Sequence, residues 1–246
     1  HMTSVVRILN RRRNSNSYKF ALLRSLVAFG KEPGEGMSVV TREWLARRFL
    51  ELYWPLTIKF RIRQATDPKR DPVVMGLIRE EERVYGGTKI GDLKTYARLL
   101  PEQYEALVRK VAKDAFDDVI PRFHMVDGNP VSPALFKAST AGVSVGPKAR
   151  LFLKESADAL DLLAVGAWVR FTEKYTSAPK LFEKIRGLKP NRSSLKQYRD
   201  FLSRGKFAVC FYCSRPEPNL VGDHVIPWTF VAEDKIWNLV LACPSC

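Results

Sequence analysis

All four cysteines of this 246-residue chain lie within residues 210–246, where they form two Cys-x-x-Cys pairs. The pairs read CFYC and CPSC, and the sulfurs belong to Cys210, Cys213, Cys243 and Cys246. Two disulfides or redox thiols would fit the count. In a chain whose start does not resemble a secretory signal, however, two such pairs favour one tetrahedral zinc site. The sequence therefore predicts that its last part folds around a structural Zn²⁺.

The net charge is +15, and the basic excess is greatest toward the N-terminus. Residues 1–70 carry 15 Lys and Arg against 5 Asp and Glu, residues 71–200 carry 22 against 17, and residues 201–246 carry 4 against 4. Such an excess favours a polyanionic partner, most often nucleic acid, although a solvated basic surface gives the same count. The residues expected to attract DNA are Arg11, Arg12, Arg13, Lys59, Arg61 and Arg63.

Apolar residues recur at helical spacing through most of the chain, which predicts a mainly helical N-terminal part. Helices are expected over 18–30, over 39–54 after a cap at Ser38, over 101–119, from 156 to 175, and around 179–187 and 194–204. Residues 121–150 are rich in Gly, Pro and Ser and are expected to form short strands or loops. In the stretch TIKFRIRQ, apolar and basic residues alternate from Ile58 to Arg63, which predicts a strand with one wholly basic face.

With 46% hydrophobic residues, the chain can bury a sizeable core. No run approaches the roughly 18 apolar residues of a membrane span, and no signal peptide is apparent. A cytoplasmic protein without a membrane partner is therefore expected.

Between the two cysteine pairs lie Asp223-His224 and, 14 residues after the histidine, Asn238. A zinc ribbon needs only its cysteines, whereas phosphodiester hydrolysis needs a base that works near neutral pH and a hard cation on oxygen ligands. The combined pattern CxxC, DHxxP and NLxxxCxxC resembles the HNH endonucleases of the ββα-metal (His-Me finger) superfamily over about 40 residues.

This resemblance implies a role for each residue of the pattern. His224 would be the general base, Asp223 would bind a catalytic Mg²⁺ or Mn²⁺, and Asn238 would fix the loop and orient His224. The four cysteines would hold zinc away from the chemistry. Outside the pattern, His124 is expected to be structural, and Glu233 and Asp234 are expected to lie on a solvated loop.

Together these features predict a mainly α (α+β) protein in two parts. Residues 1–204 would form a basic, mainly helical DNA-binding or assembly domain, and residues 205–246 a small zinc-stabilised ββα-metal HNH module. In the family, the helix after the second CxxC carries the third signature residue. The module is therefore expected to be incomplete at Cys246, and the chain as given to have little nuclease activity. The upstream helical stretch resembles that of some uncharacterised bacterial HNH proteins.

The main functional expectation is a metal-dependent DNA endonuclease of a bacterial restriction or antiviral defence type. A different class of protein is the alternative: a non-catalytic zinc-knuckle module that binds DNA or another protein, which would not need Asp223-His224. A third possibility is a nuclease subunit recruited by a partner such as an ATPase. A homodimer would be the simplest route to cutting both strands. The sequence leaves open whether the substrate is DNA or RNA.

Overall fold

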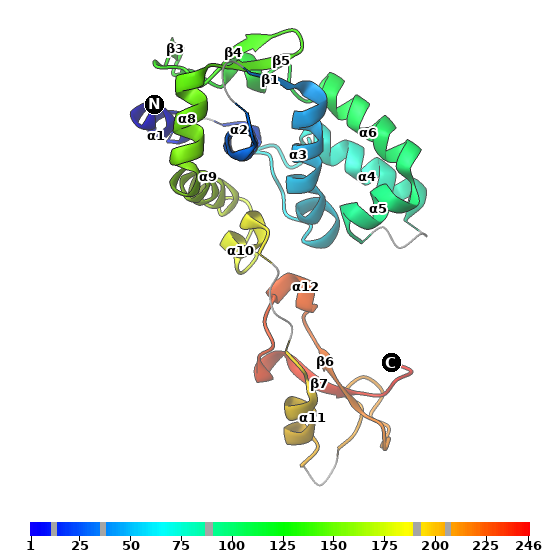
Figure 1. The fold of residues 1–246 in the computed structure, drawn as a ribbon. Helices are drawn as coiled ribbons and strands as arrows, with labels where there is room; N and C mark the ends of the chain where they lie inside the picture. The colour runs from blue at the N-terminus through cyan, green and yellow to red at the C-terminus, as the bar shows by residue number, and fades with distance from the viewer. Residues whose placement is uncertain (11–13, 35–37, 87–90, 189–192, 205–207) are drawn as a thin grey trace. The chain divides into compact units, whose positions relative to one another are not determined.

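The computed structural model describes residues 1–10, 14–34, 38–86, 91–188, 193–204 and 208–246. Two compact units are distinguished: an N-terminal unit of His1–Ser177 and Lys184–Gly187, and a C-terminal unit of Ala178–Glu183 and Leu188–Cys246 (Figure 1). Helices dominate and the strands are short, so the predicted mainly α (α+β) class is confirmed. In the described part of the chain, no helix combines the length and apolar character needed to cross a bilayer.

The N-terminal unit is built around helix α2. Its helices are α1 (Met2–Leu9), α2 (Tyr18–Lys31), α3 (Arg42–Trp54), α4 (Val73–Tyr85), α5 (Leu93–Leu99), α6 (Pro101–Asp114), α7 (Val119–Arg122), α8 (Pro147–Glu155) and α9 (Ala157–Thr172). Figure 1 shows α2 end-on with α3, α8 and α9 around it, and each of these three helices packs on α2. Because α2 is covered on several sides, its apolar residues are buried almost all the way round.

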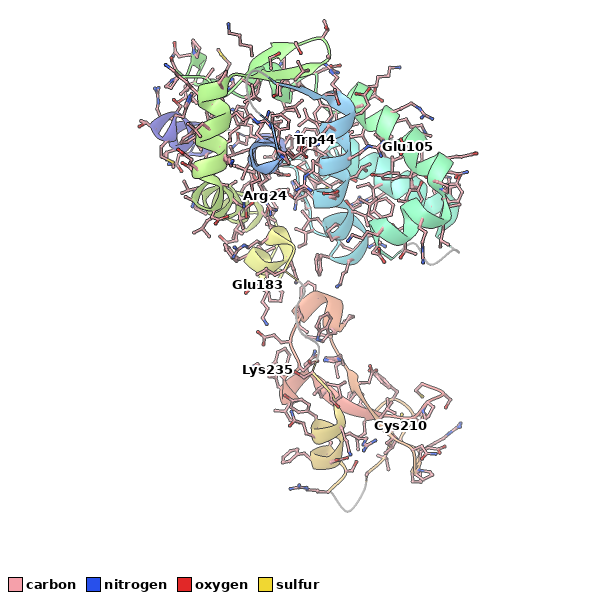
Figure 2. All side chains as sticks on the ribbon, viewed as in Figure 1. Arg24, Trp44, Glu105, Glu183, Cys210 and Lys235 are labelled. Atoms are coloured by element: carbon pink, nitrogen blue, oxygen red, sulfur yellow. The ribbon has the colours of Figure 1, made fainter. Side chains whose placement is uncertain are left out.

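Two buried hydrogen bonds link polar side chains of this core, and side chains fill the space between its helices (Figure 2). The indole Nε1 of Trp168 donates to Gln64 Oε1 at 2.5 Å, and the hydroxyls of Ser17 and Tyr53 lie 2.6 Å apart. Helices α2 and α8 approach closely at Gly30, where an added Cβ would lie 2.7 Å from Leu153 Cβ. The core therefore depends on a small residue at this crossing.

Two small antiparallel sheets accompany these helices. One has the order β1 (Ser38–Thr41), β5 (Gly142–Val145), β4 (Lys137–Ser139), and the other pairs β2 (Met125–Val126) with β3 (Asn129–Pro130). Short strands within 121–150 were predicted and are confirmed, but a cap at Ser38 was wrong. Ser38 pairs with Val145 in the sheet, and α3 is capped by Thr41, whose side chain accepts the backbone N–H of Trp44 at 3.2 Å.

The predicted basic strand over Ile58–Arg63 is also wrong. Helix α3 continues past its end at Trp54 into a π-helical turn, η1 (Pro55–Lys59), and irregular chain follows. Pro55 begins that turn and lacks the backbone N–H that would continue the α-helical hydrogen-bonding pattern of α3. The apolar and basic alternation matched a strand period, but among the described residues the only sheet-like contact here is a single bridge between Asn16 and Ala65.

His124 has the structural role that was expected of it. Its Nε2 accepts the backbone N–H of Leu135 at 2.9 Å, and its ring lies 4.4 Å from that of Phe136. Burial, followed by the charge of Lys19, lowers the pKa of His124 to about 4. The imidazole is therefore neutral near pH 7, as its role as an acceptor requires.

The C-terminal unit is a β-hairpin with helical cover. Its elements are α11 (Lys196–Leu202), β6 (Val221–His224), α12 (Trp228–Val231), the 3₁₀ turn η2 (Ile236–Asn238) and β7 (Leu239–Ala242), while the short helix α10 (Leu181–Arg186) spans the division between the units. Strands β6 and β7 are antiparallel, and α11 packs against both. Because α11 belongs to this unit, the unit begins upstream of the predicted boundary at residue 205.

Candidate metal centre and active site of the C-terminal unit

The four cysteine sulfurs converge at one point of the C-terminal unit. All four Sγ atoms lie within 4.8 Å of one another, and those of Cys213 and Cys243 are 3.8 Å apart. A tetrahedral zinc with Zn–S bonds of about 2.3 Å requires sulfurs about 3.8 Å apart. The cysteines are free rather than joined as disulfides. Both the residue types and the spacing are therefore compatible with a structural zinc ion.

The hairpin brings the two cysteine pairs together. Cys243 directly follows β7, and the backbone N–H of Phe211 donates to Leu241 O of the same strand at 2.8 Å. Ser214, in the left-handed conformation, turns the chain after the first pair and donates its N–H to Cys210 O at 2.8 Å. Cys210 and Cys243 are buried in a small cluster with Leu220 and Leu241. The first pair is thus held to the strand that carries the second.

The surroundings of Cys210 and Cys243 lower the pKa of these two thiols and so favour their thiolates, whereas those of Cys246 do not. Burial raises the pKa of Cys210, but the backbone N–H groups of Cys243, Cys213 and Tyr212 point at its sulfur and bring the pKa down to about 6. The pKa of Cys246 is raised, chiefly by its contacts with the sulfurs of Cys243 and Cys213. Four thiolates this close repel one another unless a cation lies between them.

His224 ends strand β6 and points into the unit. Its Nε2 lies 3.0 Å from Asp234 Oδ1, and each of the two side chains is only 4% exposed. The other oxygen of Asp234, Oδ2, accepts the backbone N–H of Ser193 at 2.7 Å, and the Asp234 carbonyl accepts the hydroxyl of Tyr198 at 2.9 Å. The expectation that Asp234 lies on a solvated loop is therefore wrong, because its carboxylate is buried against the histidine.

Asn238 closes the loop that follows His224. Its side chain is buried and bonds both backbone groups of Ile226: Oδ1 accepts the N–H at 2.7 Å and Nδ2 donates to the carbonyl at 2.9 Å. The carbonyl of Asn238 also accepts the N–H of Val225 at 3.0 Å. These bonds go to the backbone just after His224 and not to its imidazole.

Asp223 leaves β6 on the face opposite His224, because successive side chains of a strand alternate. It is exposed, and its Oδ2 accepts the hydroxyl of Tyr212 at 3.1 Å. Within the described residues, only the four cysteines form a cluster of three or more His, Cys, Asp or Glu ligands. Asp223 therefore offers a single carboxylate. This is enough for a Mg²⁺ ion that is otherwise held by waters and substrate phosphates.

The expected nucleic-acid contacts lie in the N-terminal unit and do not share one face of a strand. Arg11, Arg12 and Arg13 lie outside the described residues. Lys59 ends η1, and Arg61 forms a bidentate ion pair with Glu82, with N–O distances of 2.5 and 2.6 Å. Arg63 donates to the carbonyls of Ala65 and Thr66 and lies 4.7 Å from the ring of Tyr175.

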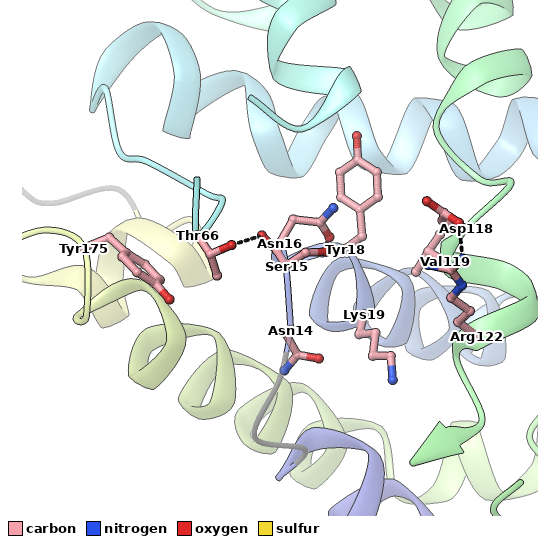
Figure 3. Close-up of a pocket in the computed structure, with 10 residues that line it drawn as sticks. All are labelled: Asn14, Ser15, Asn16, Tyr18, Lys19, Thr66, Asp118, Val119, Arg122 and Tyr175. Atoms are coloured by element: carbon pink, nitrogen blue, oxygen red, sulfur yellow. Dashed lines mark hydrogen bonds and ion pairs between the residues drawn. The ribbon is translucent and has the colours of Figure 1, made fainter. Parts of the chain in front are cut away.

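Tyr175 also lines a polar cavity of about 520 Å³ in this unit (Figure 3). The residues that line it include Asn14, which directly follows the three arginines, together with Lys19 and Arg122. Arg122 pairs with Asp118 at 3.2 Å in an exposed ion pair. Such exposed pairs contribute little energy, so Arg122 can exchange its partner at low cost.

Residues 210–246 match the family model of the HNH endonucleases. No curated protein and no solved structure shows significant similarity to the chain. The C-terminal unit thus carries an HNH module whose four cysteines form one potential metal site. The match includes Asp223, His224 and Asn238 but says nothing about the N-terminal unit.

Sequence reasoning missed the residues that surround His224. Asp234 stands ten positions after the histidine, and Ser193 and Tyr198 precede it by more than twenty. No local spacing links these three residues to His224, because the chain between them includes α11 and the first cysteine pair. Only the folded unit brings them together.

Proposed function

We propose that the protein is a metal-dependent endonuclease that hydrolyses DNA phosphodiester bonds through its HNH module. The observation that carries this proposal is the buried pair of His224 and Asp234, which lies in a hairpin that the HNH match covers. A binding module would need neither a histidine with a buried carboxylate partner nor the exposed Asp223 beside it. Histidine is also the side chain best suited to deprotonate water near neutral pH.

In this proposal, His224 takes a proton from a water molecule through Nδ1, since Nε2 is engaged by Asp234. The hydroxide forms a new bond to phosphorus, the bond to the leaving oxygen breaks, and that oxygen takes a proton from solvent. Asp223 would hold a Mg²⁺ or Mn²⁺ ion, which when bound supplies positive charge to the phosphate. The four cysteines would hold zinc, which stabilises the hairpin on which His224 is placed.

The N-terminal unit would supply the attraction to DNA. Residues 201–246 have no net charge, whereas residues 1–70 carry an excess of ten positive charges. Several arginines of this stretch already pair with carboxylates: Arg24, Arg42, Arg47, Arg48 and Arg61. The arginine run at 11–13, which directly precedes Asn14 in the sequence, is therefore the leading candidate, with Lys59 and Arg63 as further contacts.

The proposed role of the N-terminal unit in DNA binding can be tested separately from cleavage. Changing Arg11, Arg12 and Arg13 to glutamine should weaken DNA binding and flatten its dependence on salt, because fewer counterions are released. The matched control changes three exposed cations of α6 in the same way: Arg109, Lys110 and Lys113. Equal loss of binding in both triple variants would show that only net charge matters and would remove the specific role of residues 11–13.

The cleavage assay uses the full-length protein that carries residues 1–246, with supercoiled plasmid and Mg²⁺ or Mn²⁺. We expect plasmid relaxation or linearisation that is lost in His224→Ala while the bound zinc is retained. Cleavage that persists in His224→Ala would refute the assigned base. A folded, zinc-bound protein that binds DNA without cutting it would favour the zinc-knuckle binding module. Cleavage that needs an added ATPase would favour a recruited subunit.

Within this proposal, the biological setting is a bacterial cytoplasmic system of restriction or antiviral defence. The support is the combination of a nuclease module with a separate basic, helical unit. A homodimer would place two HNH modules on the two strands, and the ratio of nicked to linear product reports on this directly.

A further inference from the structure

The carboxylate of Asp234 is the only side chain among the described residues that hydrogen-bonds the imidazole of His224. We propose that Asp234 is a positioning residue: it fixes the ring of His224 with the proton on Nε2 and leaves Nδ1 free to accept a proton. This inference rests on the proposed nuclease function, because it assigns the source of the general base's orientation. The position of the proton on the His224 ring can be measured without any cleavage of DNA.

The hydrogen bonds around Asp234 decide the direction of its bond to His224. An ionised carboxylate only accepts, so a bond of 3.0 Å between Oδ1 and Nε2 requires that Nε2 carries the proton. The second oxygen, Oδ2, is already held by the N–H of Ser193 at 2.7 Å. The carboxylate is therefore oriented from one side by Ser193 and presents its other oxygen to the histidine.

Burial makes this arrangement stiff. Each side chain of the pair is 4% exposed, so water competes poorly for the bond and the local dielectric strengthens it. The backbone of Asp234 is also anchored, since its carbonyl accepts the hydroxyl of Tyr198 on α11 at 2.9 Å. Ser193 and Tyr198 therefore hold Asp234 in place, and Asp234 in turn holds the imidazole of His224.

The neighbouring Glu233 is also acidic, but its carboxylate does not contact His224. Its carboxylate lies 3.0 Å from Lys180 Nζ, and its side chain is 33% exposed. The ion pair with Lys180 lowers the pKa of Glu233. Two consecutive carboxylates therefore face different partners, and Glu233→Gln is a matched control for Asp234→Asn.

Asp234→Asn has a specific expected effect because Ser193 selects the orientation of the new amide. The N–H of Ser193 needs an acceptor, so the amide oxygen takes the place of Oδ2 and the NH₂ group faces His224. A donor opposite Nε2 requires that this nitrogen is unprotonated, so the proton moves to Nδ1. The substitution would thus preserve shape and reverse the tautomer, and Nδ1 could no longer accept a proton.

The test is ¹⁵N NMR of the imidazole rings at about pH 8, above the ordinary histidine pKa of about 6.5. The chain has three histidines, and His224→Ala identifies the signal of the third. We expect the Nε2–H tautomer in wild type and Glu233→Gln, and the Nδ1–H tautomer in Asp234→Asn. A wild-type His224 with its proton on Nδ1, or an unchanged tautomer in a folded Asp234→Asn, would overturn the proposal. The wild-type measurement stands alone where the variant does not fold.

Cleavage kinetics on the same proteins separate this inference from the proposed function. In Asp234→Asn, kcat should fall at least about 100-fold with KM nearly unchanged, since a histidine in the wrong tautomer can cost up to about 10⁴-fold. A folded Asp234→Asn that switches tautomer yet keeps the wild-type kcat would also overturn the positioning role. If the wild-type protein cuts no DNA, the nuclease function fails, and the NMR result alone decides whether Asp234 fixes the ring.

Discussion

Asn238→Ala should loosen the end of the hairpin that carries His224. The amide of Asn238 makes two hydrogen bonds to the backbone of Ile226, at 2.7 and 2.9 Å, and its residue is 1% exposed. Alanine removes both bonds and leaves a small void. Of the hydrogen bonds that link the loop directly after His224 to residue 238, the bond from Val225 N–H to the carbonyl of residue 238 would remain, because alanine retains this carbonyl.

The magnitude follows from these contacts. Each net hydrogen bond contributes about 1 kcal/mol, and a buried group left without a partner costs about 1–3 kcal/mol. Ile226 is 39% exposed, so water can reach part of its backbone, and the lower end of that range applies. We therefore expect a loss of about 2–3 kcal/mol in the C-terminal unit. At about 1.4 kcal/mol per factor of ten, local opening becomes about 30- to 150-fold more frequent.

Amide hydrogen exchange, compared at equal metal content, measures this opening, because it reports each segment separately. The expected result is faster exchange in peptides covering 221–226 and 239–242, with the N-terminal unit unchanged. Asn219→Ala is the matched control, since Asn219 is exposed in a turn of the same unit and should cost less than about 0.5 kcal/mol. Exchange in Asn238→Ala as slow as in Asn219→Ala would show that the two bonds to Ile226 do not hold the loop.

Three further predictions concern other parts of the molecule. A metal chelator should abolish the protection of backbone amides from hydrogen exchange in residues 208–246 and leave the N-terminal unit protected. If residues 208–246 stay as protected as the N-terminal unit, no ion supports the hairpin. Because the pKa of His124 is lowered to about 4 from 6.5, the unfolded chain binds its proton first as pH falls. The free energy of unfolding of the N-terminal unit, measured by denaturant titration, should therefore fall as the pH is lowered from 6.5 to about 4. The fall should be smaller in His124→Gln. An equal fall in the wild type and the variant would contradict a buried, neutral His124. Gly30→Ala should lower the melting temperature, because the added Cβ would lie 2.7 Å from Leu153 Cβ. The control is Gly76→Ala in α4, whose Cβ meets nothing within 4 Å and which should stabilise the protein by about 0.5–1 kcal/mol. Equal melting temperatures of the two variants would argue against the close approach of α2 and α8.

The metal site and most helices could be predicted because their signals are local. Two residues between paired cysteines define a knuckle whatever the rest of the chain does, and the four sulfurs do converge. Helices α2 and α9 carry enough apolar residues for their type to be clear, and both are buried in the core. The class of the fold followed from such segments without knowledge of how they pack.

Failures occurred where a local pattern depended on a distant partner. Alternation over Ile58–Arg63 matches a strand only if another strand lies beside it, and α3 instead runs on into η1. Val39 and Val40 were assigned to a helix, but β5, about a hundred residues later, pairs with them as a sheet. Asp234 was assigned to solvent for the same reason, because its partners Ser193 and His224 lie far apart in sequence.

The two ends of strand β6 are stabilised by different residues: the cysteines lie near one end, and Asn238 lies near the other. Substitutions at the two ends therefore test different parts of the proposed nuclease site. Val221 pairs with Ala242, next to the cysteine Cys243, whereas His224 pairs with Leu239, next to Asn238. A two-stranded hairpin is marginally stable alone, so loss of the metal at one end would release the histidine at the other. Cysteine substitutions would therefore abolish the proposed nuclease activity whether or not the ion at the cysteines takes part in the chemistry. Substitutions at Asp234 and Asn238 act at the histidine end and leave the sulfurs in place, so they can distinguish a misplaced base from an unfolded hairpin.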